Sequence, residues 1–105
     1  MFYGGIIIRV LIIEDDIITR TIQKGIVLEI ASKVFEASDF FGGIDIIKKS
    51  NIDLVILDIG LNGEKDGIDF LKSIKKIYLA DIKIYPNIEK EVNLPVLKNL
   101  LFNDA

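Results

Sequence analysis

Acidic side chains stand at two places where a run of apolar residues ends abruptly. Glu14, Asp15 and Asp16 follow the apolar run 6–13, in which Arg9 is the one polar residue. A fourth acid, Asp58, closes the run DLVILD. In an open parallel sheet, ligands bind outside the carboxyl ends of the strands. If the two runs form neighbouring strands, their carboxylates converge on one spot.

Converging carboxylates repel one another and lose hydration, so a cation is needed to keep them ionised. The chain contains no His and no Cys, which leaves oxygen ligands and therefore Mg²⁺, Ca²⁺ or Mn²⁺. Mg²⁺ is often shared between one or two carboxylates and a phosphate. A metal-bound carboxylate can also act as a nucleophile towards phosphorus, because the cation orients it and shields the incoming negative charge.

A simpler interpretation competes with this metal site. Acidic residues at strand ends are frequently helix N-caps, and Asp16 is assigned to capping for that reason. An Asp that closes an apolar strand, such as Asp58, is by itself more often a loop residue. The combination of two acidic strand ends with the turn-rich segment GLNGEKDG after the second favours the site.

The elements that must position these acids follow from the pattern of apolar residues. A helix is expected after Asp16, because Ile18, Ile22, Ile26 and Ile30 recur every four residues. The expected strands are 6–13, 33–37 and 54–57, and further helices are expected from Ser38 or Asp39 to 49 and over 68–78. Alternating strands and helices predict an α/β fold with a parallel sheet between two layers of helices. Beyond Tyr78 the pattern weakens to a strand at 80–85 and a helix at 89–102 interrupted by Pro95.

Composition limits the partners. The length of 105 residues and an apolar fraction of 50% suit a single domain, 1–105, with a buried core. The formal net charge of −3 gives no attraction to phosphate backbones, so no nucleic-acid partner is expected. The apolar opening segment is too short to span a bilayer and lacks a basic leader, so no membrane is expected and the protein is predicted to be cytoplasmic.

Three stretches resemble the response-regulator receiver domains of two-component signalling. RVLIIEDDIITRTI is similar to the first strand, acidic cluster and first helix of that family. DLVILDIGLNGEKDGIDFLKSIKK is similar to the phosphoacceptor strand, loop and third helix, and FEASDFFGGIDII to the second strand and helix. The resemblance implies a flavodoxin-like doubly wound parallel sheet in three α/β/α layers.

The resemblance also implies roles. Asp58 would accept phosphate from the phosphohistidine of a sensor histidine kinase or phosphotransfer protein, for a downstream effector protein. Asp15 would bind Mg²⁺ directly, and Glu14 directly or through water. The backbone carbonyl of Gly60 would supply another ligand.

The chain departs from the family after Tyr78, where two further βα units normally follow. The remaining segment is too short for both, since a βαβ unit takes roughly 30 residues. One alignment matches ADIKIYPNIEKEVNLPVLKNLL to the fifth strand and last helix, with Tyr85 in place of the Lys before Pro86. Another places the fourth strand at 94–102. The switch Ser or Thr is missing in both, since the last such residue is Ser73. Either the chain is naturally degenerate, or the sequence omits residues that the molecule contains.

Three functions remain open at this point. The first is a phosphoacceptor domain that is not a turnover enzyme. The second is a receiver-like interaction module without phosphorylation, which the missing Ser or Thr and Lys favour. The third is a small phosphatase, but such enzymes place a second acidic residue two positions after the nucleophile, where Gly60 stands.

Overall fold

A computed structural model describes residues 7–58, 72, 82–87 and 91–102. The helix expected at 68–78 lies outside these residues, apart from Lys72. The described elements are, in chain order, β1 (Arg9–Ile13), α1 (Ile17–Val27), β2 (Lys33–Ala37), α2 (Phe40–Lys49), β3 (Leu54–Asp58), β4 (Lys83–Asn87) and α4 (Leu94–Phe102).

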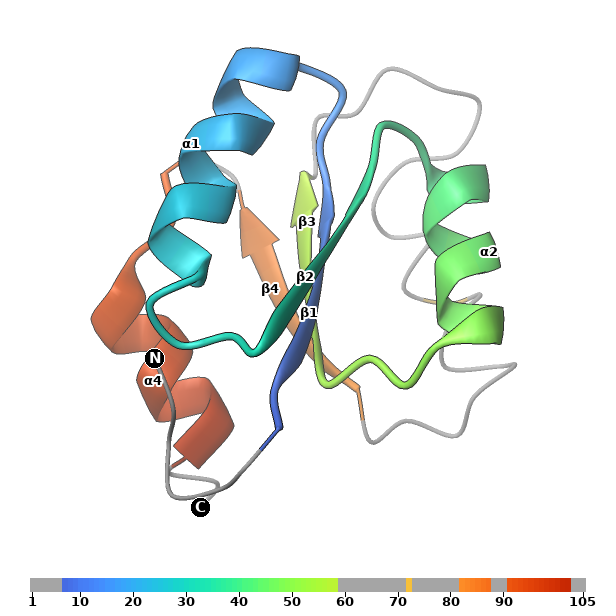
Figure 1. The fold of residues 1–105 in the computed structure, drawn as a ribbon. Coiled ribbons are helices and arrows are strands. Elements are labelled where there is room, and N and C mark those ends of the chain that lie inside the picture. The colour runs from blue at the N-terminus through green and yellow to red at the C-terminus, as the bar shows by residue number, and fades with distance from the viewer. Residues whose placement is uncertain (1–6, 59–71, 73–81, 88–90, 103–105) are drawn as a thin grey trace.

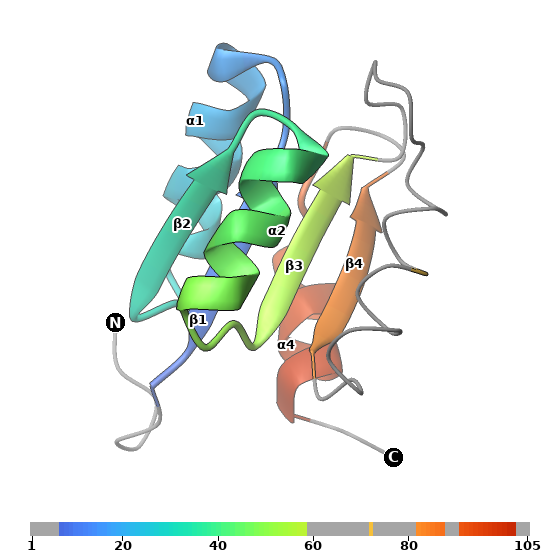
Figure 2. The ribbon, with the colours of Figure 1, turned by 90° about the vertical axis from the view of Figure 1, so that its right-hand side faces the viewer.

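The four strands form a parallel sheet in the order β2-β1-β3-β4. Figure 1 shows α1 and α4 on one face of this sheet and α2 on the other, and the strand order can be followed in Figure 2. The chain passes from β1 outward to β2 and then back across β1 to β3. Because each crossover is right-handed, this reversal places α1 and α2 on opposite faces. The predicted doubly wound three-layer sheet is confirmed.

The central strands are buried on both faces. Leu11 and Ile13 of β1 belong to the core under α2, whereas Val10 and Ile12 belong to the core on the side of α1 and α4. All four are 0% exposed. Double burial explains why the apolar run is continuous and does not alternate with polar residues.

The buried face of α1 differs from the one that its isoleucines suggested. Ile18 and Ile22 are 69% and 60% exposed, and the buried residues of this helix are Gln23 and Val27. The four-residue spacing correctly predicted a helix. It did not identify the core face. Successive residues of a helix are about 100° apart around its axis, so Ile22 and the adjacent Gln23 point in different directions.

The C-terminal elements correct three expectations. The strand lies at Lys83–Asn87, and it pairs with β3 in the fourth position of the flavodoxin-like order 2-1-3-4-5. Residues 94–102 form a helix, so the alternative fourth strand there is wrong. Pro95 does not interrupt this helix but lies in its first turn, where a missing N–H costs little. Asn93 caps the turn by accepting a hydrogen bond from the Val96 amide at 3.1 Å.

Within the described part of the chain, no helix has the length and apolar character needed to cross a membrane.

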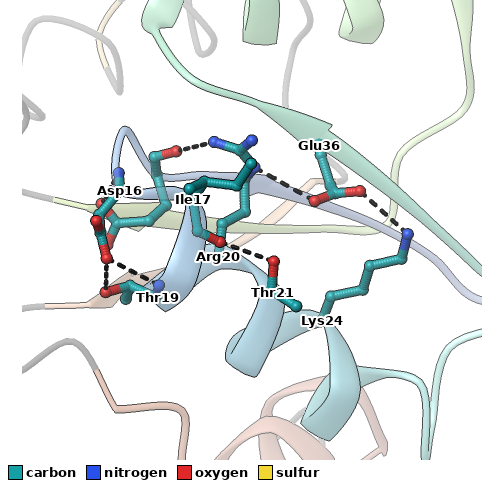
Figure 3. Close-up of polar contacts among 8 residues, drawn as sticks. Asp16, Ile17, Thr19, Arg20, Thr21, Lys24 and Glu36 are labelled. Carbon is teal, nitrogen blue, oxygen red and sulfur yellow. Dashed lines mark hydrogen bonds and ion pairs between the residues drawn. The ribbon is translucent and has the colours of Figure 1, made fainter.

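Two cations of α1 bind one carboxylate of β2 (Figure 3). Glu36 accepts hydrogen bonds from Lys24 Nζ at 3.1 Å and from Arg20 Nε at 3.3 Å. Lys24 first, and Arg20 with it, lowers the pKa of the Glu36 carboxyl below its ordinary value of 4.5. These contacts fix α1 against the edge strand β2. Arg20 also donates a hydrogen bond to the Glu14 carbonyl in the acidic loop.

Replacing this carboxylate tests the link. Because the folded-state pKa of Glu36 is lowered, its stabilisation is present above about pH 4.5 and is lost as the pH falls through the folded value. Glu36→Gln should therefore reduce the free energy of unfolding by about 0.5–1 kcal/mol at pH 7, the scale of partly exposed ion pairs. Urea denaturation between neutral pH and about pH 3 should show the difference from wild type vanish. The exposed Glu29→Gln is the matched control, and a pH-independent difference at Glu36 would refute the assignment.

Candidate metal centre

Three acidic side chains meet at the carboxyl edge of the sheet. Glu14 and Asp15 directly follow β1, and Asp58 is the last residue of β3. The two strands are adjacent and in register, with Ile13 opposite Leu57, so Glu14 lies level with Asp58. Carboxylate oxygens of the three residues lie within 4.8 Å of one another. The convergence expected from the sequence is present.

The environment of these acids is unusual for negative charge. Glu14 is 0% exposed and Asp58 is 2% exposed, whereas Asp15 is open to solvent. Burying ionised carboxylates beside one another is costly unless a cation or hydrogen bonds compensate. A cation entering from the Asp15 side would meet all three.

Hydrogen bonds hold both the backbone and the side chain of Glu14. Its amide donates to the Ala37 carbonyl at 3.0 Å, which extends the β1–β2 ladder by one residue. Its own carbonyl accepts from Arg20 Nη1 at 2.7 Å, and its Oε2 accepts from the Asp16 amide at 3.2 Å. Arg20 thus links the acidic loop to Glu36 of β2. In these bonds it contacts the backbone carbonyl of Glu14 and not a carboxylate of the cluster.

Asp16 has the role that was expected of it. It is the N-cap of α1, and its Oδ2 accepts hydrogen bonds from the amide of Thr19 at 2.9 Å and from the Thr19 hydroxyl (Figure 3). A cap of this kind satisfies amides that have no partner within the helix. Asp16 therefore fixes the start of α1 and lies outside the metal-ligand group.

The ligand set suits a hard divalent cation. Three carboxylates supply only oxygen, and the chain has no His or Cys to favour a softer metal. Mg²⁺ binds oxygens at about 2.0–2.1 Å and usually keeps several waters, so three side chains leave room for solvent or a phosphate oxygen. Gly60, whose carbonyl was predicted as a further ligand, lies outside the described residues.

Sequence reasoning missed one polar side chain at this edge. Asn87 ends β4 opposite Asp58 in the strand register, and it is 2% exposed. The expected strand 80–85 ends before Asn87, and Tyr85 was matched to the position of the family's Lys. The Tyr85 hydroxyl instead makes 3.4 Å hydrogen bonds to the Glu91 carbonyl and the Asn93 amide. Had the strand been predicted to end at Asn87, this residue would have been expected at the same edge as Asp58.

The opposite edge of the sheet has a structural role. Asp53 Oδ2 accepts from the Arg9 amide at 2.8 Å, and the Asp53 carbonyl accepts from the Lys83 amide at 2.9 Å. These bonds tie the amino ends of β1, β3 and β4 together. A pocket of about 660 Å³ opens beside Asp53 and Lys48, far along the strands from the acidic cluster. It does not contribute to the candidate metal centre.

Several known proteins are similar to this chain. The aerobic respiration control protein ArcA of Escherichia coli K12 is 36% identical over 68 residues, which is 65% of this chain but only 28% of ArcA. The MaeR response regulator bound to beryllium trifluoride superposes with a TM-score of 0.71 at 20% identity, covering 90% of this chain and 77% of that one. RcsB in complex with DNA gives a TM-score of 0.69 at 24% identity, covering 77% of this chain and 42% of RcsB.

The expectation that nucleic acid plays no part is wrong. Structural neighbours include response regulators of the RcsB type that are bound to DNA. The net charge of −3 belongs to these 105 residues, which match less than half of the RcsB chain. A weak charge on the matched part says nothing about DNA contacts made elsewhere.

The sequence of residues 10–86 matches the family model of the response regulator receiver domain. This range includes the acidic loop after β1, Asp58 and nearly all of β4. The strand order and the carboxylate cluster agree with the match, and the chain belongs to the response-regulator receiver domain family.

Proposed function

We propose that this receiver domain accepts a phosphoryl group on Asp58 from the phosphohistidine of a histidine kinase or phosphotransfer protein. The observation that carries the proposal is the meeting of Glu14, Asp15 and Asp58 within 4.8 Å at the carboxyl edge of the sheet. Membership of the receiver family supports the same chemistry.

The residues divide the work according to their placement. Glu14 and Asp15 would hold Mg²⁺ from the β1 side, and Asp58 would contribute a carboxylate oxygen from β3, with the Gly60 carbonyl as a further ligand. When bound, the cation would supply the positive charge that neutralises the carboxylates and the phosphoryl oxygens. Rigid strand ends on both sides limit the rearrangement that this binding needs.

The transfer is a substitution at phosphorus. A carboxylate oxygen of Asp58 forms a bond to phosphorus while the bond from phosphorus to the imidazole nitrogen breaks. The electron pair of that bond stays on the imidazole nitrogen, and the ring leaves as neutral imidazole because its other nitrogen carries a proton in the phosphohistidine. The products are an aspartyl phosphate and a free histidine, so atoms and charge balance without a further reagent.

Output is proposed to reach DNA through an effector. The support is that RcsB, whose fold this chain shares in part, is found in complexes with DNA. The alternative is a receiver-like interaction module without phosphorylation, which the lack of any Ser or Thr after Ser73 favours.

Metal binding can be tested with two neighbouring substitutions of equal charge. Asp15→Asn should weaken Mg²⁺ affinity by about tenfold or more, because it removes a charged ligand. Asp16→Asn should change it by about twofold or less, because Asn remains a good N-cap and Asp16 is not a ligand. Titration with Mg²⁺ followed by NMR shifts of the acidic loop measures both affinities. Equal weakening by the two substitutions would mean that only net charge matters.

Phosphorylation can be tested with a small donor. Acetyl phosphate should label the wild-type chain in the presence of Mg²⁺ and not after its removal with EDTA. Asp58→Asn should abolish labelling, because the amide is a far weaker nucleophile than the carboxylate. Labelling that survives Asp58→Asn would exclude Asp58 as the acceptor, and no labelling of a wild-type chain that binds Mg²⁺ would favour the interaction module.

A further inference from the structure

We infer that Asn87 is the hydrogen-bond donor to the phosphoryl group on Asp58, through its side-chain Nδ2. This inference rests on the proposed function and names the residue that binds the phosphoryl oxygens. No Ser or Thr follows Ser73 in the sequence, so a hydroxyl from the later strand is not available for this role.

The strand register places Asn87 beside the acceptor. Asp58 and Asn87 are partners in the parallel β3–β4 pair, and neighbouring strands lie about 4.8 Å apart. Side chains two residues apart in a strand share a face. Ile56 and Tyr85 both belong to the core on the side of α1 and α4, so Asp58 and Asn87 project to that same side.

The amide of Asn87 is buried and its donor is unused. The residue is 2% exposed, and its Nδ2 has no hydrogen-bond partner among the described residues. A buried donor without an acceptor is destabilising, so such groups in native proteins call for an explanation. An acceptor that arrives with phosphorylation provides one.

The chemistry of the edge requires a donor of this kind. A phosphoryl group presents three anionic oxygens that only accept hydrogen bonds, and the ionised carboxylates of Glu14 and Asp15 are acceptors as well. The Asn amide offers two N–H donors without adding charge. Among the described residues, a second buried atom without a partner belongs to Gln23, but this atom is Oε1, an acceptor that phosphate would repel.

The test uses the intact chain with Mg²⁺ and beryllium trifluoride, a compound that coordinates a carboxylate as a phosphoryl group does. Asn87→Ala should weaken beryllium trifluoride binding by about 10–100-fold, the loss expected for a hydrogen bond to a charged acceptor. Mg²⁺ affinity, measured separately by NMR titration, should stay within about twofold. Asn51→Ala, an exposed site at the opposite edge of the sheet, is the control and should leave both affinities unchanged.

Two further variants separate donation from packing. Asn87→Thr restores a donor and should bind beryllium trifluoride within about threefold of wild type, whereas Asn87→Asp has nearly the same shape without the donor and should bind more weakly than Asn87→Ala. Wild-type affinity in Asn87→Ala or Asn87→Asp overturns the inference, as does a parallel loss of Mg²⁺ affinity. If the wild-type chain binds Mg²⁺ but not beryllium trifluoride, the proposed phosphorylation and the role of Asn87 both fail. If the wild-type chain binds beryllium trifluoride and the Asn87 variants bind it equally well, only the role of Asn87 fails.

Discussion

The pairing of β1 with β3 is the constraint on which the site depends. Hydrogen bonding in parallel register, with Ile13 opposite Leu57, carries Glu14 and Asp58 to the same edge although they are far apart in the sequence. Side chains of both strands hold that register, because they are buried in the cores on the two faces of the sheet: Leu11 and Val55 on one face, Ile12 and Ile56 on the other. A shift of one residue would exchange the two faces and separate the carboxylates.

The contacts around this pair favour one electrostatic arrangement. Hydrogen bonds fix Glu14 at its amide, its carbonyl and its Oε2, and Asp16 fixes the start of α1. Glu14 is thereby held at the end of β1, next to the end of β3. Two members of the carboxylate cluster are buried, and carboxylates in such a cluster repel one another unless a cation or hydrogen bonds compensate. A phosphoryl group on Asp58 would add negative charge at the same place, which a cation and a hydrogen-bond donor would both offset.

Much of this arrangement could be predicted from the sequence, and the reasons are local. The runs before Glu14 and Asp58 are long and apolar enough to indicate buried strands, and Asp16 and Asp39 have the side chains that cap helices. The predictions failed where tertiary packing overrides the pattern. α1 buries Gln23 and exposes Ile18, and no periodicity rule anticipates a polar core position.

The end of β4 was harder to predict for a different reason. Pro86 argues against a strand, but β4 lies at the edge of the described sheet, where a residue without an N–H is tolerated. The strand therefore continues through Pro86 to Asn87. The position of Asn87 beside Asp58 follows from this register alone, and pattern analysis of a single sequence does not supply the register of a distant strand.

Under the proposed function, the carboxylate cluster makes Asp58 the residue that receives the phosphoryl group. Reductive trapping measures this directly, because borohydride converts an aspartyl phosphate into homoserine, which fragment mass spectrometry locates in the chain. After reaction with a phosphodonor and Mg²⁺, homoserine is expected at position 58 and should be absent when Mg²⁺ is withheld. Homoserine at any other acidic position, or its formation without Mg²⁺, would contradict the account.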